Sequence, residues 1–572
     1  MMTQVRKANI FVTLREYGKM GIELDEALDI AENEYVQGNF TVRKADQSYI
    51  VCANVSCIPY PYDYFRAFAE ENALEFVFLL GGEPFQALAI RKSDPFWAKP
   101  AFFSDTQGKT CKHIQQLLLK MKEKYVHIMP LTTENTVGEM IYDNEEKQIK
   151  ICSNSFQGSL TALEGPLFII SEASNPYEAV ENSYVTARKT GLIKTPLRTE
   201  KKYPEQLEGL GWCTWNAFYH EVTEDGIRAK LQELREKGIR LDWLIIDDGW
   251  SRFKEFKLQS FEEDRRKFPS GLKAFIASIK REYGVRYVGV WHAFTGYWFG
   301  VDKESQLYTQ QKGNLEETSA GLVVPAGEYE KAYAFYHTWH QYLADQGVDF
   351  LKVDTQGNAL EFLRGTRDAV KKVAVLHEAL EQSVQDCFGG AMIDCMGMDN
   401  LDGFNRKYSS VLRSSGDFFP DKEDGFRSHI EQNSYNAVFC NQLYYCDFDM
   451  WWTKHFQAKQ SCALRKISGG PIYVSDKVGD TQTEYLKQLV NEDGSVTRYE
   501  NAARPTVDCL FGYDKVLKLF NKQGSTYMIA VFNLSEEDVT TTVTKADLGL
   551  MGDGGVNVTV KAGDVEFVRL FD

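Results

Sequence analysis

The sequence lacks the signatures of several large classes of protein. No run approaches the roughly 18 consecutive apolar residues that a membrane-spanning helix needs, and the first residues lead into an alternating pattern instead of the apolar core of a signal peptide. There is no CxxC pair, no HxH or HExxH motif, and the nine histidines do not cluster. No GxGxxG follows a first strand, which disfavours a nucleotide-binding sheet. We therefore expect no membrane segment, no metal site and no cofactor.

Charge and cysteine usage narrow the partners and the compartment. The formal net charge of −16 argues against nucleic acid or an anionic membrane surface as a main partner. Eleven cysteines, an odd number without regular spacing, indicate buried thiols of a reducing compartment, so we expect a cytoplasmic protein. The aromatic content of 13% suits stacking on sugar rings, although most of these rings are expected in the core.

With 572 residues the chain is too long for one ordinary core, and its pattern changes twice. We expect an N-terminal β-sandwich domain at 1–200, a catalytic barrel at 201–495 and a small antiparallel β-domain at 496–572. In the first domain, short alternating runs at 39–42, 49–52 and 76–80 predict strands, with a turn at Gly81-Gly82.

Helical periodicity interrupts the first domain. In 112–124, Ile114, Leu117, Leu118 and Met121 follow a period of 3.6 and predict a helical insert. A second helix is predicted at about 173–190, and the polar run 194–208 with its two prolines predicts a linker.

The middle of the chain alternates apolar runs with helical patterns. The clearest helix follows Thr223, with Ile227, Leu231 and Leu234 on one face and Gly238 as its stop. Eight βα units in about 270 residues favour an α/β protein with a (β/α)8 TIM barrel over an open doubly wound sheet. The eight predicted strands are 209–215, 243–247, 287–291, 350–354, 391–395, 410–413, 437–441 and 471–475.

In such a barrel, function lies at the carboxyl ends of the strands. Carboxylates and tryptophans follow nearly every predicted strand, which is typical of a pocket for a neutral polyhydroxylated ligand. We therefore predict a sugar as the ligand. The candidate ligands of this sugar are Trp215, Asp247, Asp248, Trp291, Lys352, Cys395, Arg413, Asp449 and Asp476.

Two carboxylates are candidates for the chemistry. Lys352 and Asp354 alternate onto the same side of one strand, and a lysine beside an aspartate holds it ionised, as a nucleophile requires. A plain salt bridge at the strand end is the alternative. Asp417 lies in a Gly- and Ser-rich loop before aromatic residues, where apolar surroundings would raise its pKa as an acid requires. Arg413, four residues earlier, would lower that pKa if the two side chains paired.

Two acidic motifs allow more than one interpretation. Asp247 and Asp248 precede Gly249, so both carboxylates could turn into one pocket and grip neighbouring hydroxyls, or one could cap the next segment. A metal site there lacks convergent ligands. The triplet 447–449 resembles the DxD of nucleotide-sugar glycosyltransferases only weakly, and a solvated loop or a contact with substrate is the better interpretation.

Longer motifs carry a family resemblance. The sequence resembles glycoside hydrolase family 36, and within it the raffinose synthase and seed-imbibition (alkaline α-galactosidase) branch. The resemblance depends on LGWCTWNAFY at 210–219, LIIDDGW at 244–250, WHA and GYW at 291–298, SGGPIYVSDK at 468–477, and RPT with DCLF at 504–511.

The resemblance implies a retaining double displacement on α-galactosides, with Asp354 as the nucleophile and Asp417 as the acid/base. It further implies that Asp247 and Asp248 hold the O4 and O6 side of the sugar, and that Cys395 lies near O2. Lys352 and Arg413 would bind the other hydroxyls, between walls formed by Trp215 and Trp291. Asn216 and Gly416 depart from the usual pattern of this branch, which has acidic residues there.

We therefore expect a retaining α-galactosidase acting on small oligosaccharides. The alternatives are a galactosyltransferase of the raffinose synthase type, a hydrolase of another α-glycoside such as an α-N-acetylgalactosaminide, and a non-catalytic sugar-binding protein. The sequence leaves open whether the chain forms a homo-oligomer.

Overall fold

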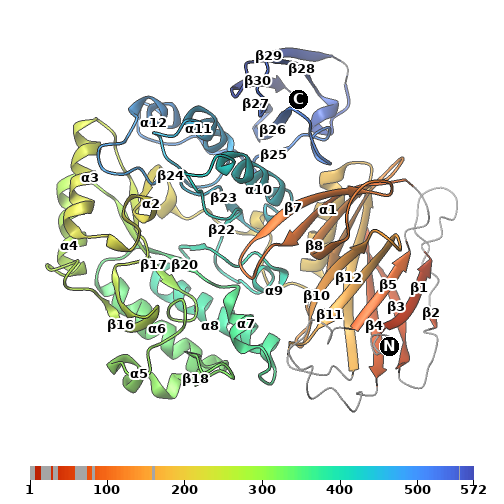
Figure 1. Cartoon of the computed structure of the whole chain (residues 1–572), viewed down its shortest axis with the longest axis horizontal. Coiled ribbons are helices and arrows are strands. Elements are labelled where there is room, and N and C mark those ends of the chain that lie inside the picture. Colours follow the sequence, from red (N-terminus) through yellow and green to blue (C-terminus); the bar gives the residue numbers. More distant parts are fainter. Residues whose placement is uncertain are drawn as a thin grey trace. The chain divides into compact units, whose positions relative to one another are not determined.

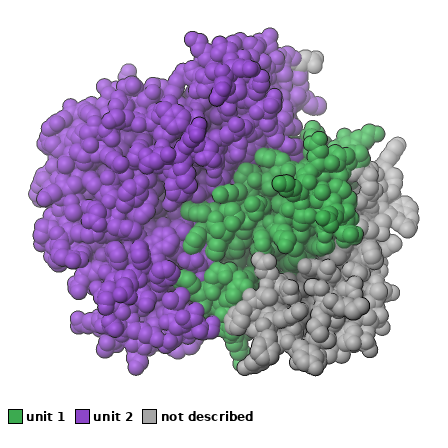
Figure 2. All heavy atoms as spheres, in the orientation of Figure 1, with its two compact units in different colours: residues 1–195, 360–374, 399–405 green, residues 196–359, 375–398, 406–572 purple. Residues whose placement is uncertain are grey.

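The computed structural model describes residues 7–13, 28–29, 36–57, 74–79, 84–156, 162–552 and 554–571. The chain forms two compact units (Figure 2). The first consists of residues 1–195 with 360–374 and 399–405, and the second of 196–359, 375–398 and 406–572. The division into three domains at 200 and 495 stays a prediction.

The first unit is built on one sheet of 12 strands (Figure 1). Their order is β1-β5-β11-β10-β8-β9-β12-β4-β3-β2, with β6 and β7 joined through β8, and the pairing is antiparallel except between β1 and β5. The predicted N-terminal β-structure is confirmed, while the expected turn at Gly81-Gly82 lies outside the described residues. The strands are β1 (Lys7–Thr13), β2 (Leu28–Asp29), β3 (Val36–Ala45), β4 (Ser48–Cys57), β5 (Leu74–Leu79), β6 (Gln86–Lys92), β7 (Ala98–Ser104), β8 (Cys111–Lys120), β9 (Tyr125–Pro130), β10 (Val137–Asp143), β11 (Gln148–Asn154) and β12 (Ala162–Ala173).

The predicted helical insert at 112–124 is wrong, because this segment is strand β8. The strand pairs with β6, β9 and β10, and residues 114–119 are all buried. A strand covered on both faces carries apolar residues at consecutive positions, and some of these fall at helical spacing by chance. Leu117 and Leu119 enter one core with Ile128 of β9 and Met140 of β10.

The predicted helix near 173–190 is confirmed as α1 (Pro176–Lys189). Its start follows from the sequence, because the side chain of Asn175 accepts the backbone N–H groups of Tyr177 and Glu178 and Pro176 occupies the first turn. In the segment predicted as a linker, two short 3-10 helices form at Arg198–Glu200 and Glu205–Leu207.

The second unit contains the predicted barrel. Eight strands pair in the order β23-β22-β21-β20-β17-β14-β13-β24, all in parallel, and the first strand of the barrel, β13, pairs with the last, β24. The register places Lys352 beside Trp291 and Arg413 beside Asp447, so the members of each pair are neighbours across the sheet. The strands are β13 (Leu210–Cys213), β14 (Trp243–Ile246), β17 (Tyr287–Ala293), β20 (Phe350–Asp354), β21 (Met392–Asp394), β22 (Val411–Arg413), β23 (Tyr445–Asp447) and β24 (Ile472–Val474).

Helices connect these strands. The predicted helix after Thr223 is α3, whose first turn is capped by the Thr223 hydroxyl accepting the Gly226 N–H at 3.1 Å, and which buries Ile227, Leu231 and Leu234. The main connecting helices are α3 (Glu224–Glu236), α4 (Leu272–Tyr283), α6 (Tyr329–Asp345), α8 (Ala369–Phe388), α10 (Gly425–Cys440), α11 (Ala458–Ile467) and α12 (Thr483–Leu489), and shorter ones are α2 (Trp215–Phe218), α5 (Gln306–Gln311), α7 (Asn358–Leu363) and α9 (Asn400–Gly403).

The predicted seventh strand at 437–441 is wrong. Residues 437–440 end helix α10, and the seventh strand is β23 at Tyr445–Asp447. Helix α10 buries residues on all sides, among them Ile430, Tyr435 and Val438, and a short apolar run from such a helix cannot be told from a buried strand by its pattern.

The C-terminal strands are antiparallel, as predicted. A four-stranded sheet has the order β25-β26-β27-β30, and β28 pairs with β29. The Tyr435 hydroxyl of α10 donates to the Cys509 carbonyl at 2.6 Å, which ties this part to the barrel. Among the described residues, every helix is too short or too polar to cross a bilayer. The strands are β25 (Arg504–Pro505), β26 (Val516–Gln523), β27 (Thr526–Asn533), β28 (Val539–Thr544), β29 (Gly555–Val560) and β30 (Val565–Phe571).

Candidate active site

The backbone is strained where three barrel strands end. Thr355 after β20, Met396 after β21 and Asp449 after β23 have φ values of 61°, 53° and 68°, in the left-handed region that residues with a side chain rarely adopt. Thr355 is β-branched, which makes its conformation the least favourable of the three. Such strain costs about 1–3 kcal/mol per residue and collects at functional sites, so it marks the carboxyl face of the barrel.

Asp354 is the carboxylate at the end of β20, and its side chain is held at both oxygens. The Trp291 indole N–H donates to Oδ2 at 2.9 Å, and the Thr355 backbone N–H donates to Oδ1 at 3.1 Å. Burial raises the pKa of Asp354, and the charge of Asp417 raises it further. The charge of Lys352 lowers this pKa but does not outweigh burial. The carboxylate is therefore fixed in orientation and poorly solvated.

Lys352 pairs with a different aspartate from the one beside it in sequence. Its Nζ lies 2.8 Å from Oδ2 of Asp247, and both side chains are 3% exposed. The Cys213 thiol donates to the same oxygen at 3.1 Å. The salt bridge of Lys352 is therefore with Asp247 and not with Asp354. The charge of Lys352 lowers the pKa of Asp354, as expected, but burial outweighs this effect and the pKa is raised.

Asp248 has its own set of donors. The Tyr297 hydroxyl donates to Oδ1 at 2.5 Å, and the Trp298 indole N–H donates to Oδ2 at 3.0 Å. The ring of His220 lies 3.1 Å from Oδ2, and the hydrogen bond to Asp248 raises the pKa of that histidine. Asp247 and Asp248 therefore turn to separate groups of side chains.

Glycine at position 249 allows these loops to pack. Gly249 has a φ of 109°, and a Cβ there would lie 2.6 Å from the carbonyl oxygen of His220. Only glycine therefore lets the loop after β14 touch the loop after β13, which brings His220 to Asp248.

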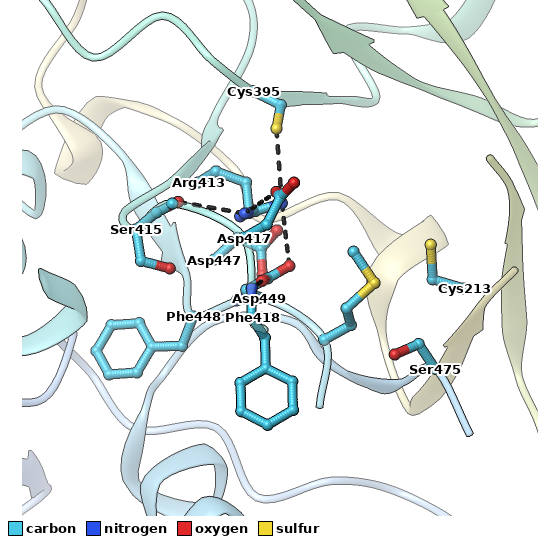
Figure 3. Close-up of polar contacts among 12 residues, drawn as sticks. Cys213, Cys395, Arg413, Ser415, Asp417, Phe418, Asp447, Phe448, Asp449 and Ser475 are labelled. Carbon is cyan, nitrogen blue, oxygen red and sulfur yellow. Dashed lines mark hydrogen bonds and ion pairs between the residues drawn. The ribbon is translucent and has the colours of Figure 1, made fainter. Parts of the chain in front are cut away.

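Arg413 joins several candidate residues (Figure 3). The guanidinium is fully buried and lies 3.0 Å from Oδ1 of Asp417 and 3.0 Å from Oδ1 of Asp449, and it also donates to the Cys395 sulfur at 3.6 Å. The sequence left open whether Arg413 and Asp417 pair, and they do. Burial raises the pKa of Asp449, but the charge of Arg413 lowers it, and the pKa lies well below its usual range.

Cys395 lies among these charges. Burial raises the pKa of its thiol. The charges of Asp354 and Asp417 raise this pKa further, whereas those of Arg413 and Lys352 lower it. The strand ends of β20, β21 and β22 therefore bring together the residues that the sequence assigned to the chemistry.

The three remaining predicted sugar ligands also have partners inside the protein. Both oxygens of Asp476 are bonded by Thr453, through its N–H at 2.6 Å and its hydroxyl at 2.7 Å, and burial raises the pKa of Asp476 to about 6. Asp449 accepts the Phe418 N–H at 2.8 Å besides its pair with Arg413. Trp215 is half-buried, 5.2 Å from the ring of Tyr219. Their contacts with a sugar stay predictions.

The arrangement suits chemistry at an acetal carbon. Asp354 is a buried, oriented carboxylate, whereas the side chain of Asp417 is 35% exposed and accessible from solvent. Two such carboxyl groups are what glycoside cleavage requires, one to attack and one to move a proton. The charged and hydroxyl groups around them can bind the hydroxyls of a sugar.

Comparison with known families decides the relationship. The family described as raffinose synthase or seed imbibition protein Sip1 matches residues 115–267 and 251–569. This chain belongs to that raffinose synthase family. The family resemblance inferred from the motifs is thereby confirmed.

Two plant relatives in the raffinose synthase family are about one-third identical to this chain. They are probable galactinol–sucrose galactosyltransferases 6 and 1 of Arabidopsis thaliana, 32% identical over 72% of this chain and 33% identical over 72%, respectively. Stachyose synthase of Pisum sativum is 27% identical over 75% of this chain. The chain spans 60%, 61% and 65% of the length of these three relatives.

Solved structures share the fold. The family 36 α-galactosidase AgaA of Geobacillus stearothermophilus aligns with a TM-score of 0.58 and 12% identity over 94% of this chain and 83% of its own. The α-galactosidase TtGalA of Thermus thermophilus, in complex with stachyose, aligns with a TM-score of 0.54 and 16% identity over 79% of this chain and 96% of its own. At these identities the likeness concerns the fold, and it confirms the predicted barrel with β-domains before and after it.

Sequence reasoning assigned no role to the donors that hold the acidic side chains of this family member. Tyr297 and Trp298 lie in the GYW motif that carried the resemblance, yet nothing in the sequence connected them to Asp248. Tyr473, whose hydroxyl donates to Asp447 at 2.8 Å, lies within a strand and has no signal of its own. The departure Asn216 accepts the Ser475 hydroxyl at 2.9 Å.

Proposed function

We propose that this protein transfers α-galactosyl groups by a retaining mechanism, from an α-galactoside donor to a hydroxyl of a second sugar. The observation that carries the proposal is the pair formed by Asp354 and Asp417, one buried and held at both oxygens, the other partly exposed on the guanidinium of Arg413. Its membership of the raffinose synthase family supports galactose as the transferred group.

In the first step, a carboxylate oxygen of Asp354 attacks the anomeric carbon of the donor. The bond from that carbon to the leaving oxygen breaks, and the proton on Asp417 passes to the leaving oxygen. The product is a galactosyl ester of Asp354. Trp291 and Thr355 orient the attacking carboxylate. Burial raises the pKa of this carboxylate, and because the carboxylate is poorly hydrated it is also a stronger nucleophile.

In the second step, the Asp417 carboxylate takes the proton of an incoming hydroxyl. The oxygen of that hydroxyl attacks the anomeric carbon from the face that the leaving group vacated, and the bond to Asp354 breaks. Two inversions give net retention. If the hydroxyl belongs to a sugar, the outcome is transfer; if it belongs to water, the outcome is hydrolysis.

Transfer and hydrolysis differ only in this acceptor. The motifs alone favour hydrolysis. The names of the relatives, galactinol–sucrose galactosyltransferases and stachyose synthase, support transfer better, so transfer becomes the main proposal. Hydrolysis stays the second candidate, supported by an α-galactosidase of Zygotorulaspora mrakii that is 26% identical over 36% of this chain.

Product analysis separates the two. The protein is incubated with galactinol at a fixed concentration and sucrose at increasing concentrations, and the products are resolved by anion-exchange chromatography. We expect a galactosyl-sucrose product whose share rises with sucrose at the expense of free galactose. Free galactose as the sole product at every sucrose concentration would favour the hydrolase. Cleavage of an α-N-acetylgalactosaminide without cleavage of any α-galactoside would refute galactose as the donor sugar.

A further inference from the structure

Exposed apolar side chains of the barrel gather on one face. Each of the large apolar side chains that are exposed among the described barrel residues lies in a segment that follows the carboxyl end of a strand. These residues are Tyr219, Phe256, Phe299, Phe419, Phe456 and Val478. This is the face on which the candidate active site lies, so the exposed rings require an explanation connected with that site.

A continuous row of aromatic rings leads from Asp354 to solvent. Trp291, which donates to Asp354, contacts Tyr297 edge-to-face at 5.6 Å between centroids. Tyr297 stacks on Phe253 at 4.6 Å, and Phe253 lies 6.2 Å from Phe256. Trp291 and Tyr297 are buried, Phe253 is half-buried, and Phe256 at the outer end is 45% exposed.

The row ends in a pair of exposed rings. Phe299 is 48% exposed, and its ring meets that of Phe256 edge-to-face at 6.3 Å. We call Phe256 and Phe299 the aromatic shelf. Its connection to Trp291 makes the shelf the outer continuation of the wall beside the candidate nucleophile.

The hairpin that carries Phe256 is strained. Strands β15 (Ser251–Lys254) and β16 (Lys257–Glu263) are joined by the two residues Glu255 and Phe256, whose φ values are 49° and 56°. A two-residue turn with both φ values positive favours Asn-Gly, and a bulky aromatic residue at its second position is unfavourable. The fold thus tolerates strain in order to present an aromatic ring at the tip of this hairpin.

Backbone hydrogen bonds fix the shelf in place. The Phe299 N–H donates to the Phe256 carbonyl at 2.9 Å, and the Leu258 N–H donates to the Gly300 carbonyl at 2.9 Å. The Asp302 N–H donates to the Leu258 carbonyl at 2.9 Å. The two rings therefore come from different loops but form one pre-organised surface.

The neighbours of the rings favour a sugar over a protein partner. Phe256 is preceded by the exposed charged residues Lys254 and Glu255, and Lys254 pairs with Glu304 at 3.1 Å. Protein interfaces have few lysines and glutamates at their centres. A pyranose ring has an apolar C–H face that stacks on an aromatic ring and hydroxyls that bond charged groups at its rim.

We propose that the aromatic shelf is the binding site for the second sugar, the ring that leaves with the donor's anomeric oxygen or arrives as the acceptor. The proposal rests on the proposed function, because it names where the acceptor of that reaction binds. The shelf lies at the solvent end of the aromatic row, and the sugar to be transferred lies at the Asp354 end.

The test uses Phe256→Gly and Phe299→Ala with Phe567→Ala as a matched control. Phe567 is an exposed ring of β30, outside the barrel, and is 38% exposed. With α-galactosyl fluoride as a donor that has no leaving sugar, transfer to sucrose is measured as a function of sucrose concentration. We expect the KM for sucrose to rise about tenfold in each shelf variant, a loss of one stacking contact, and to stay at the wild-type value in the control.

Stability separates binding from folding. Phe256→Gly relieves the strained turn, so its Tm is expected to rise while the KM for sucrose rises too. A misfolded variant would show the opposite change in Tm. An unchanged KM for sucrose in both shelf variants would overturn the proposal. So would a change from oligomer to monomer in Phe256→Gly with that KM unchanged, since the shelf would then be a contact between copies of the chain.

A binding measurement without turnover keeps the two proposals apart. Saturation-transfer NMR reports contact between protein protons and dissolved sucrose. We expect a saturation-transfer signal on sucrose with the wild type, and we expect the shelf variants to lose this signal. If α-galactosyl fluoride is not consumed but this transfer is seen and lost as expected, the proposed function fails and the shelf stands. If α-galactosyl fluoride is consumed but the wild type gives sucrose no saturation-transfer signal, the proposed sugar site on the shelf is refuted and the proposed function is not.

Discussion

Removing the hydrogen bond from Trp291 to Asp354 should weaken the reaction in a measurable way. Trp291→Phe keeps a ring in the wall but deletes the N–H that lies 2.9 Å from Oδ2. A hydrogen bond to a charged group contributes about 1.5–3 kcal/mol. The bond also orients the attacking carboxylate, and a misplaced nucleophile costs up to about 100-fold in rate. If Asp354 is the nucleophile, kcat/KM at neutral pH should therefore fall by about 10- to 100-fold in Trp291→Phe.

The pH dependence gives the sign of the effect. Burial raises the pKa of Asp354, and the bond from Trp291 lowers it. Losing the bond raises that pKa further. Because the reaction needs the ionised carboxylate, the acid limb of the kcat/KM profile should move to higher pH in Trp291→Phe.

Trp339→Phe is the matched control. Trp339 is a buried tryptophan of α6, 1% exposed, whose indole N–H has no hydrogen-bond partner among the described residues. Both variants lose part of a buried indole, but only one loses a bond to Asp354. The assay is initial-rate kinetics with α-galactosyl fluoride from pH 4 to 8. An acid limb that stays in place in Trp291→Phe, or one that moves equally in Trp339→Phe, would refute the reasoning.

Three further substitutions test the electrostatics and the strain. Asp354→Asn should abolish turnover and raise Tm near neutral pH. The folded-state pKa of Asp354 is raised, so its ionisation destabilises the folded protein as the pH rises, and asparagine does not ionise. Differential scanning fluorimetry as a function of pH measures this difference in Tm. Lys352→Met leaves Asp247 charged and buried and should cost about 3–5 kcal/mol in urea unfolding, much of it recovered when Asp247→Leu is added. Thr355→Gly should release about 1–3 kcal/mol of backbone strain, raising the midpoint of urea unfolding, and lower kcat because the N–H that orients Asp354 becomes mobile; equal stability in this variant would contradict the strain argument.

The positions of the strand ends could be predicted from the sequence because a buried parallel strand is a short apolar run that stops at its first polar residue. Phe350–Asp354 is the clearest case, and β20 has these bounds. The same rule failed in longer buried segments. Residues 114–119 of β8 and most residues of α10 are buried, so their apolar runs fit both a helix and a strand.

The partners of the charged residues could not be predicted. Lys352 and Asp354 face the same side of one strand, yet Lys352 reaches across to Asp247 because neighbouring strands and their twist decide which charge lies nearer. The donors to Asp248 come from loops whose course depends on Gly249 and on the close approach of His220, and neither can be read from local sequence.

The most direct test of the account is to trap the covalent intermediate. The protein is treated with a 2-deoxy-2-fluoro α-galactosyl fluoride, digested, and analysed by mass spectrometry. The account predicts one fluorogalactosyl group per chain, located on the peptide that contains Asp354, with no label in Asp354→Asn. A label on another residue, or steady turnover of α-galactosides by Asp354→Asn, would contradict it.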